Sequence, residues 1–329
     1  MPSLESRIAA WWMRCVRQRR RCAAALGAAP AAIAPTLPSA AQARQARITV
    51  SAFDGHPLYR VSPRDQPAAA ASTARVLYLH GGAYVRPITR HHWNFVVDLV
   101  RRTGCEVVVP LYPLAPRHAG LTALTLVSQV YAAEAAAGLP MIVMGDSAGG
   151  GLALALAGWI RDQPLPPPAL LVLLSPWVDV EIPHPDAVRL QAVDPMLTLD
   201  GLRRAGRAYA GPLGGAHPVI SPARADPRGL PPMAIHVGGC ELFAPDVLDY
   251  VARARALGAR IELHQVPSMM HVWPLLGLLP EARVTRALIA QQLQAALANQ
   301  PGPVTLAADL PPRDAPGDSQ IQAVRKSRA

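Results

Sequence analysis

The chain has 329 residues, of which 51% are apolar and 16% are charged, so it can build a sizeable core and is not globally disordered. Its net charge of +10 comes almost wholly from arginine, because Lys326 is the only lysine. Apart from the run 17–21 the arginines are spread out, with few aromatic residues between them, so we expect no nucleic-acid partner. The four cysteines have neither paired nor metal-ligand spacing, which predicts no disulfide scaffold and no metal site.

The first 45 residues are rich in Ala, Arg and Pro and allow two interpretations. The first is an amphipathic cap helix, because apolar residues recur at helical spacing at Leu4, Ile8, Trp11, Trp12 and Cys15. The second is a signal peptide over residues 1–43, with a basic run, an alanine-rich stretch and Ala41-Gln42-Ala43 as the cleavage site. The first interpretation predicts a cytoplasmic protein and the second an exported one. No apolar run of about 18 residues occurs, so no spanning helix is expected.

Strands alternate with helices over residues 46–299, which predicts a single α/β domain with a mostly parallel, doubly wound sheet. Apolar and alternating runs predict strands at 47–53, 57–61, 75–79, 105–109, 139–144, 169–174, 233–237 and 261–266. Periodic runs bounded by Gly and Pro predict helices at 92–102, 121–137, 152–160, 199–210, 245–257 and 280–298. Asp54-Gly55 predicts a hairpin between the first two strands.

Two stretches depart from this alternation. Residues 176–228 are rich in Pro and Asp and contain only one predicted helix, and an excursion of this length from a compact sheet usually covers a site. Residues 300–329 combine Pro, Gly and charge, which predicts a disordered tail.

The nucleophile candidate is Ser147, within Gly145-Asp146-Ser147-Ala148-Gly149. This G-x-S-x-G pattern lies between an apolar strand and an Ala/Leu-rich helix, which is the context of a nucleophile elbow. A turn this tight needs small residues on both sides of the serine, because any Cβ there would clash with the crossing backbone. A serine hydroxyl is a poor nucleophile alone, so a base, an acid and an oxyanion hole must be sought elsewhere.

The best candidate for the base is His271, which follows the strand 261–266 by a short loop. Most of the other histidines lie in the hairpin, near helix starts, in the excursion or inside strand runs, where a structural role is favoured.

Two carboxylates follow the strand 233–237 and compete to orient His271. Glu241 is nearer the strand end, where such acids lie. Asp246 follows Pro245 and fits the first turn of a helix, where a carboxylate meets free amides. The residues alone favour Glu241 and leave Asp246 as the alternative.

The oxyanion hole is predicted at Gly81, Gly82 and Ala83, in the glycine-rich loop after the strand 75–79, together with the amide of Ala148 after the nucleophile. Backbone amides converge on one oxygen only where no side chain blocks it, which accounts for the two glycines.

With these motifs in order, residues 47–298 resemble the hormone-sensitive-lipase-like branch of the α/β-hydrolases. Its characteristic segments have counterparts at 80–84, 111–116, 145–150, 194–196 and 270–273. The resemblance implies the α/β-hydrolase fold with a helical cap, formed here by residues 1–45 with a contribution from 178–210. It also places the acid about thirty residues before the histidine; because 271 − 241 = 30 and 271 − 246 = 25, it favours Glu241. Two departures are Arg117, where the family usually has glutamate, and Ala83, where it has glycine.

The resemblance implies a serine carboxylesterase that hydrolyses short- to medium-chain acyl esters through Ser147, His271 and Glu241, without a cofactor or metal. The alternatives are a lactone hydrolase for terpene-type lactones with the same triad and a non-catalytic small-molecule-binding protein. The expected partner is a small ester or lactone, and the sequence leaves a homodimer open.

Overall fold

The computed structural model describes residues 2–15, 33–65 and 74–298, in which eight strands form one twisted sheet. Their order across the sheet is β1-β2-β4-β3-β5-β6-β7-β8. The strands are β1 (Arg47–Phe53), β2 (His56–Ser62), β3 (Arg75–Leu79), β4 (Glu106–Pro110), β5 (Met141–Asp146), β6 (Leu170–Leu174), β7 (Met233–Gly238) and β8 (Ile261–Val266). β1 and β2 run antiparallel as a hairpin and β3 to β8 run parallel, so the predicted mostly parallel sheet is confirmed.

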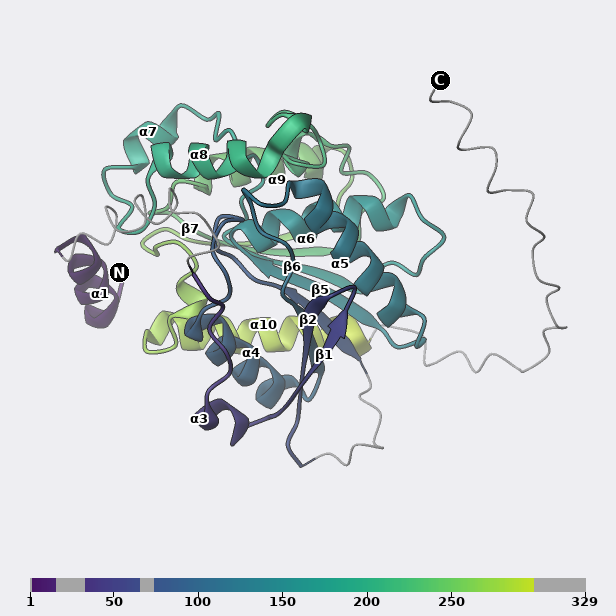
Figure 1. Ribbon diagram of the computed structural model, residues 1–329. Helices are drawn as coiled ribbons and strands as arrows, with labels where there is room; N and C mark the ends of the chain where they lie inside the picture. Colours follow the sequence, from purple (N-terminus) through teal and green to yellow (C-terminus); the bar gives the residue numbers. More distant parts are fainter. Residues whose placement is uncertain (1, 16–32, 66–73, 299–329) are drawn as a thin grey trace, which may run out of the picture.

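Helices cover both faces of the sheet, as Figure 1 shows. One face carries α5 (Gly120–Ala135), α6 (Ala148–Arg161) and α9 (Ala244–Ala256), with α7 (Asp186–Leu190) and α8 (Leu199–Ala210) above them. The other face carries α4 (Arg90–Thr103) and α10 (Pro280–Ala298). The short elements are α3 (Ala40–Ala43), η2 (Gly211–Leu213), η3 (Pro222–Arg224) and η4 (Trp273–Leu275).

The two-residue period of the strands divides the core into two layers. In β3, Leu77 and Leu79 join the cluster under α5, α6 and α9, whereas Val76 and Tyr78 join the cluster under α4 and α10. Central strands of a parallel sheet are buried on both faces, which explains why they appear in the sequence as continuous apolar runs.

The order of the strands reverses at β3. The chain passes from β3 through α4 to β4 on one side, and then through α5 to β5 on the other side. In open α/β sheets, the crevice outside the carboxyl ends of the strands at such a switch point is where ligands bind. The loops after β3 and β5 begin here, and these loops contain the predicted oxyanion residues and Ser147.

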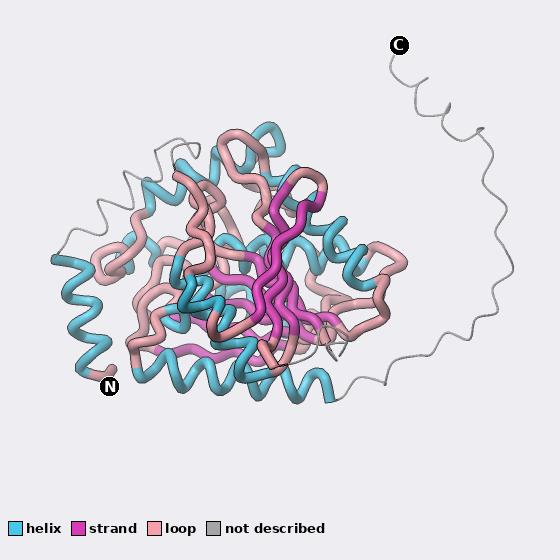
Figure 2. Tube along the Cα trace, turned by 60° about the horizontal axis from the view of Figure 1, so that its bottom comes forward, coloured by secondary structure: helices cyan, strands magenta, loops and turns pink. Residues whose placement is uncertain are grey.

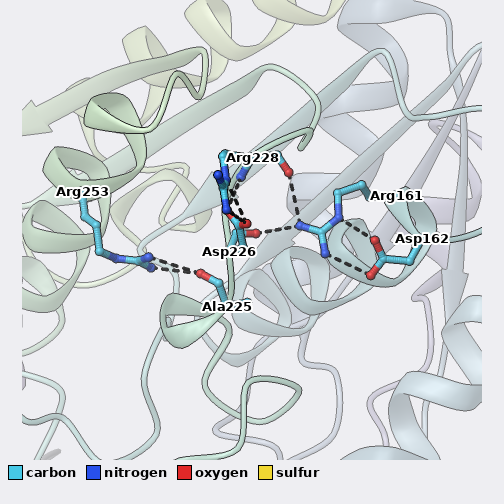
Figure 3. A network of polar contacts seen from close by, with 6 residues as sticks. All are labelled: Arg161, Asp162, Ala225, Asp226, Arg228 and Arg253. Atoms are coloured by element: carbon cyan, nitrogen blue, oxygen red, sulfur yellow. Dashed lines mark hydrogen bonds and ion pairs between the residues drawn. The ribbon is translucent and has the colours of Figure 1, made fainter.

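The excursion between β6 and β7 contains more regular structure than the single helix predicted. The helix at 199–210 is confirmed as α8, and α7, η2 and η3 are additional. Its return to the sheet is fixed by arginines, as Figure 3 shows: Arg161 of α6 donates to the carbonyl of Asp226, and Arg253 of α9 donates to the carbonyl of Ala225. Arg228 pairs with the carboxylate of Asp226. Part of the large arginine content therefore serves loop structure.

The predicted amphipathic helix of the lead is confirmed as α1 (Leu4–Cys15). Figures 1 and 2 both show it at the margin of the molecule. Ser3 and Ser6 bind the carboxylate of Glu281 on α10, with Oγ–Oε2 distances of 2.9 and 2.6 Å. The alanine-rich stretch of the signal-peptide interpretation and the predicted tail lie largely outside the described residues. None of the helices in the described ranges has the length and hydropathy needed to span a bilayer.

Candidate active site

Ser147 occupies a strained turn between β5 and α6. Its φ of 54° and ψ of −121° are rare for a residue with a side chain, and such conformations persist only where the surroundings fix them. The Ser147 amide donates to the Leu174 carbonyl of β6 at 2.8 Å. Beyond the turn, a Cβ on Gly149 would lie 2.0 Å from the Leu79 carbonyl oxygen, so only glycine allows α6 to approach β3 this closely.

A chain of hydrogen bonds joins three of the predicted residues. Nε2 of His271 lies 2.9 Å from Oγ of Ser147, and Nδ1 of His271 lies 2.7 Å from Oε2 of Glu241. The exposed fractions are 7% for Ser147, 3% for His271 and 0% for Glu241. A buried carboxylate on Nδ1 holds the tautomer whose Nε2 can accept a proton from the serine.

The loops that carry the base and the acid are bonded to each other. The Cys240 amide donates to the Met269 carbonyl at 3.0 Å, and the Val272 amide donates to Oγ of Ser175 at 3.0 Å. The second oxygen of Glu241 accepts the Gly238 amide at 3.1 Å. These bonds fix the glutamate at the end of β7 and the histidine after β8, so the geometry does not depend on the three side chains alone.

Asp246, the alternative acid, points elsewhere. It lies in the first turn of α9, where its Oδ1 accepts the His184 amide at 3.1 Å. Its Oδ2 has no hydrogen-bond partner within the described ranges. Burial raises the pKa of this carboxyl to about 6. The structure therefore brings Glu241, and not Asp246, to His271.

Asp194 is a buried carboxylate whose bracing role the sequence did not reveal. Its Oδ1 accepts the amides of Met196 and Leu197 at 2.7 and 2.9 Å, and its Oδ2 accepts the amide of Leu242 at 2.9 Å. Burial raises its pKa to about 6, although these amides act in the opposite direction. Because Leu242 follows Glu241, Asp194 ties the excursion to the loop of the acid.

The backbone amides of the loop after β3 differ in whether they already donate a hydrogen bond within the protein. The Gly81 amide donates to Oδ1 of Asp146 at 3.0 Å, so it shapes the loop and is not free for a ligand. The amides of Gly82, Ala83 and Ala148 donate to no group in the described part of the chain. Ala83 has a φ of 54°, the left-handed region that costs a residue with a Cβ about 1 kcal/mol.

Asp146, directly before Ser147, anchors this loop from below. It accepts hydrogen bonds from Tyr78 Oη at 2.5 Å and from Gly81, and its Oδ2 lies 3.4 Å from Nε2 of His92. Burial alone would raise the pKa of Asp146, but His92, Tyr78 and Gly81 together lower it. From the sequence, His92 was expected only to lie near the start of a helix. Its position in the sequence does not show that its Nε2 reaches Asp146 at the end of β5.

His80 is a structural residue of the same loop. Its ring stacks on Tyr112 with centroids 4.5 Å apart, and its Nδ1 lies 2.7 Å from the Gly81 carbonyl. Burial lowers the pKa of His80 to about 4, so its imidazole is neutral at pH 7.

Four buried rings, which we call the aromatic wall, close one side of the site. They are Tyr84, Trp177, Tyr209 and Phe243, each 1–2% exposed. Tyr84 stacks on Tyr209 with centroids 3.5 Å apart, and the edge contact of Phe243 with His271 has centroids 5.1 Å apart. The Trp177 amide donates to the Ser147 carbonyl at 2.9 Å. Rings with so little accessible surface leave no water-sized space between them.

Comparison with known proteins gives one matching family model, described as alpha/beta hydrolase fold, over residues 76–275. An esterase of Acinetobacter venetianus is 29% identical over 229 residues, which are 68% of this chain and 76% of the relative. The carboxylesterase/phospholipase LipF of Mycobacterium tuberculosis is 30% identical over 274 residues, which are 79% of this chain and 67% of the relative.

Solved structures agree with these relatives. The crystal structure of an esterase from the bacterial hormone-sensitive lipase family superposes with a TM-score of 0.72 at 29% identity. The match covers 85% of this chain and 90% of that chain. The similarity therefore extends beyond the sheet to most of both chains.

Proposed function

We propose that Ser147, His271 and Glu241 are the catalytic triad of this chain, which belongs to the alpha/beta hydrolase fold family. Within that family it is one of the hormone-sensitive-lipase-like esterases, and it is a carboxylesterase- or lipase-type serine hydrolase. The observation that carries this proposal is the buried hydrogen-bond chain from Glu241 through His271 to Ser147, at 2.7 and 2.9 Å.

The reaction proceeds in two stages. Ser147 Oγ attacks the ester carbonyl while Nε2 of His271 accepts its proton, and Glu241 stabilises the imidazolium that forms. His271 then donates this proton to the leaving alcohol as the acyl–oxygen bond breaks. Water, activated by the same imidazole, attacks the acyl-enzyme and releases the acid and free Ser147.

The oxyanion of each tetrahedral intermediate is stabilised by the amides of Gly82, Ala83 and Ala148. These three amides have no other partner in the described part of the chain, and they come from the two loops that meet at the switch point. One such donor is worth about 3–4 kcal/mol of transition-state stabilisation.

The decisive test removes the nucleophile. The Ser147→Ala variant is expected to lose at least about 10³-fold in kcat for p-nitrophenyl butyrate while its melting temperature stays within a few degrees of wild type. Mass spectrometry after treatment with a fluorophosphonate should find the label on the Ser147 peptide. Labelling of another residue, or undiminished turnover by the variant, would reject the triad. Absence of both turnover and labelling in the wild type would instead favour the alternative of a non-catalytic binding protein.

We further propose that the substrates are esters with short to medium acyl chains. The aromatic wall fills the space beside Ser147 and His271, so a long chain cannot pass on that side. Hydrolysis of p-nitrophenyl acetate and butyrate should therefore exceed that of the laurate ester in kcat/KM. Terpene-type lactones in the same panel separate esterase from lactonase preference.

The cap is proposed to comprise residues 1–45 with a contribution from 178–210. α1 lies beside the loops at 193–196 and 268–270, next to the proposed acid and base, and α8 supplies Tyr209 to the aromatic wall. Both segments are thus placed to restrict access to the carboxyl edge of the sheet.

A further inference from the structure

α1 leaves its large apolar side chains largely exposed. Leu4, Ile8, Trp11 and Trp12 are 66%, 53%, 61% and 56% exposed. The opposite side of the helix carries Ser6 and smaller residues, and it faces α10 and the cluster around Met269 and Met270. An ordinary surface helix buries its apolar stripe, so this orientation leaves a partner to be identified.

The exposed apolar surface continues onto both neighbours of α1. A groove of about 590 Å³ lies between Leu4, Ile8 and Trp11 on one side and Val193 on the other. A second groove, of about 880 Å³, lies between Trp12 and Leu278, which is 85% exposed.

Six of the thirteen exposed large apolar side chains in the described ranges therefore lie on α1 or beside it. We call α1 and its two grooves the α1 face. This apolar surface is larger than the single, scattered apolar residues that occur on any protein surface.

The charged residues that line the two grooves of the α1 face are positive. Arg7 lines the first groove and Arg90 lines the second. Arg286 also lines the second groove, but it is 8% exposed and pairs with Asp98. Neither groove has an acidic residue among its described lining residues, and the exposed Glu5 of α1 lies outside both. The whole chain carries +10. A second copy of the chain would bring one basic face against the same basic face, so charge disfavours self-association here.

We infer that the α1 face docks on an anionic lipid surface. Tryptophan favours the interface between headgroups and acyl chains, and arginine pairs with lipid phosphate. A 12-residue helix is about 18 Å long, so α1 lies in the plane of the surface and cannot cross it.

The location of the face gives docking a consequence. Cys240 and Met270 line the first groove, and each adjoins a residue of the proposed triad. Docking would hold the carboxyl edge of the sheet close to ester groups in the lipid layer. The docking face itself does not depend on the proposed triad, because binding is measured without turnover.

Intrinsic fluorescence provides the test. Trp11 and Trp12 are exposed, whereas Trp93, Trp177 and Trp273 are at most 1% exposed. Adding phosphatidylcholine vesicles that contain phosphatidylglycerol to the full chain should shift the emission to the blue. Vesicles of pure phosphatidylcholine should bind at least about tenfold more weakly, and high salt should weaken the anionic binding.

Two variants distinguish binding through the α1 face from nonspecific hydrophobic binding. Leu278→Asp should weaken vesicle binding at least about tenfold, because it replaces an inserted apolar side chain by a charge that anionic lipid repels. Leu257→Asp is the matched control. Leu257 is 43% exposed but lies before β8, at the amino ends of the parallel strands, whereas α1 lies at their carboxyl ends. Both variants should hydrolyse p-nitrophenyl acetate at the wild-type rate, which shows that they are folded.

Several outcomes would overturn the inference. These are no binding to either vesicle, equal binding to both, or equal loss in the two leucine variants. An emission already shifted to the blue without lipid would show that the face is covered by the chain itself. A shift that follows protein concentration and dimerisation in sedimentation would make the partner a second copy.

Discussion

The surroundings of Ser147 and the helix α1 lie at the same carboxyl edge of the sheet. The sequence predicts which residues are buried around Ser147, but it does not predict which side chains of α1 are exposed. Around Ser147, the glycine spacing and apolar runs correspond directly to close backbone contacts and full burial. In α1, the helical spacing of Leu4, Ile8, Trp11 and Trp12 correctly predicts a helix, but those side chains point to solvent. Periodicity shows that residues share a face and does not show which way the face points.

The physical difference is the number of independent restraints. The turn at Ser147 is held by a strand, a helix and two neighbouring loops, so one arrangement satisfies all of them. α1 is bound chiefly through Glu281 and a few small apolar contacts, so its rotation follows a local hydrogen-bond pattern. Elements with few buried contacts open at lower free energy.

The largest expected effect is on catalysis, at the tightly restrained site around Ser147. Glu241→Gln should lower kcat for p-nitrophenyl butyrate by about 10³- to 10⁴-fold, because an amide on Nδ1 does not hold the productive tautomer or stabilise an imidazolium. Asp246→Asn, the matched control, should stay within about tenfold of wild type, since Asp246 contacts His184. A reversal of the two results would assign the acid to Asp246.

Packing at the same turn predicts the next effect. Gly149→Ala places a Cβ 2.0 Å from a backbone carbonyl and should lower the free energy of unfolding by at least about 3 kcal/mol. Gly158→Ala, in the same helix α6 with nothing within 4 Å of the new Cβ, should raise it by about 0.5–1 kcal/mol. Urea unfolding measures both, and similar values for the two would contradict the claimed close approach.

Buried histidine makes the body of the protein sensitive to acid. Burial lowers the pKa of His236, which is 0% exposed, from 6.5 to about 4. The unfolded chain therefore takes up this proton first as the pH falls, and about 3 kcal/mol of stability is lost between pH 6.5 and about 4. His236→Gln should remove that part of the loss, whereas His118→Gln, at an exposed position, should not. Parallel pH dependence of all three proteins in urea melts would refute this.

The smallest effect is expected at α1. Glu281→Ala removes the hydrogen bonds to Ser3 and Ser6, so trypsin should cleave after Arg7 several-fold faster while the free energy of unfolding changes by less than about 1 kcal/mol. Glu5→Ala, at an exposed acid of α1 itself, should leave the cleavage rate unchanged. A loss of several kcal/mol in the Glu281 variant would show that α1 belongs to the cooperative core.

Much of the fold could be predicted because its signals are local. All eight strands and the six helices predicted after the lead are present, with shifts of a few residues at their ends. The short helices α3 and α7 were missed because four or five residues carry too little periodicity to be recognised. The turn at Ser147 was recognisable because its two glycines lie within five residues and form a local motif, although the backbone that Gly149 approaches belongs to Leu79 of β3.

The sequence by itself determined the order of strands and helices, the sheet class and the residues from which a site could be built. Only the tertiary structure decided which of two nearby carboxylates reaches His271, that Gly81 is held by Asp146, that His92 and Asp194 brace the two loops, and that α1 presents its tryptophans outward. The reason is that a periodic pattern depends on neighbours within one or two turns, whereas each of these contacts joins residues distant in sequence or depends on the direction of a side chain.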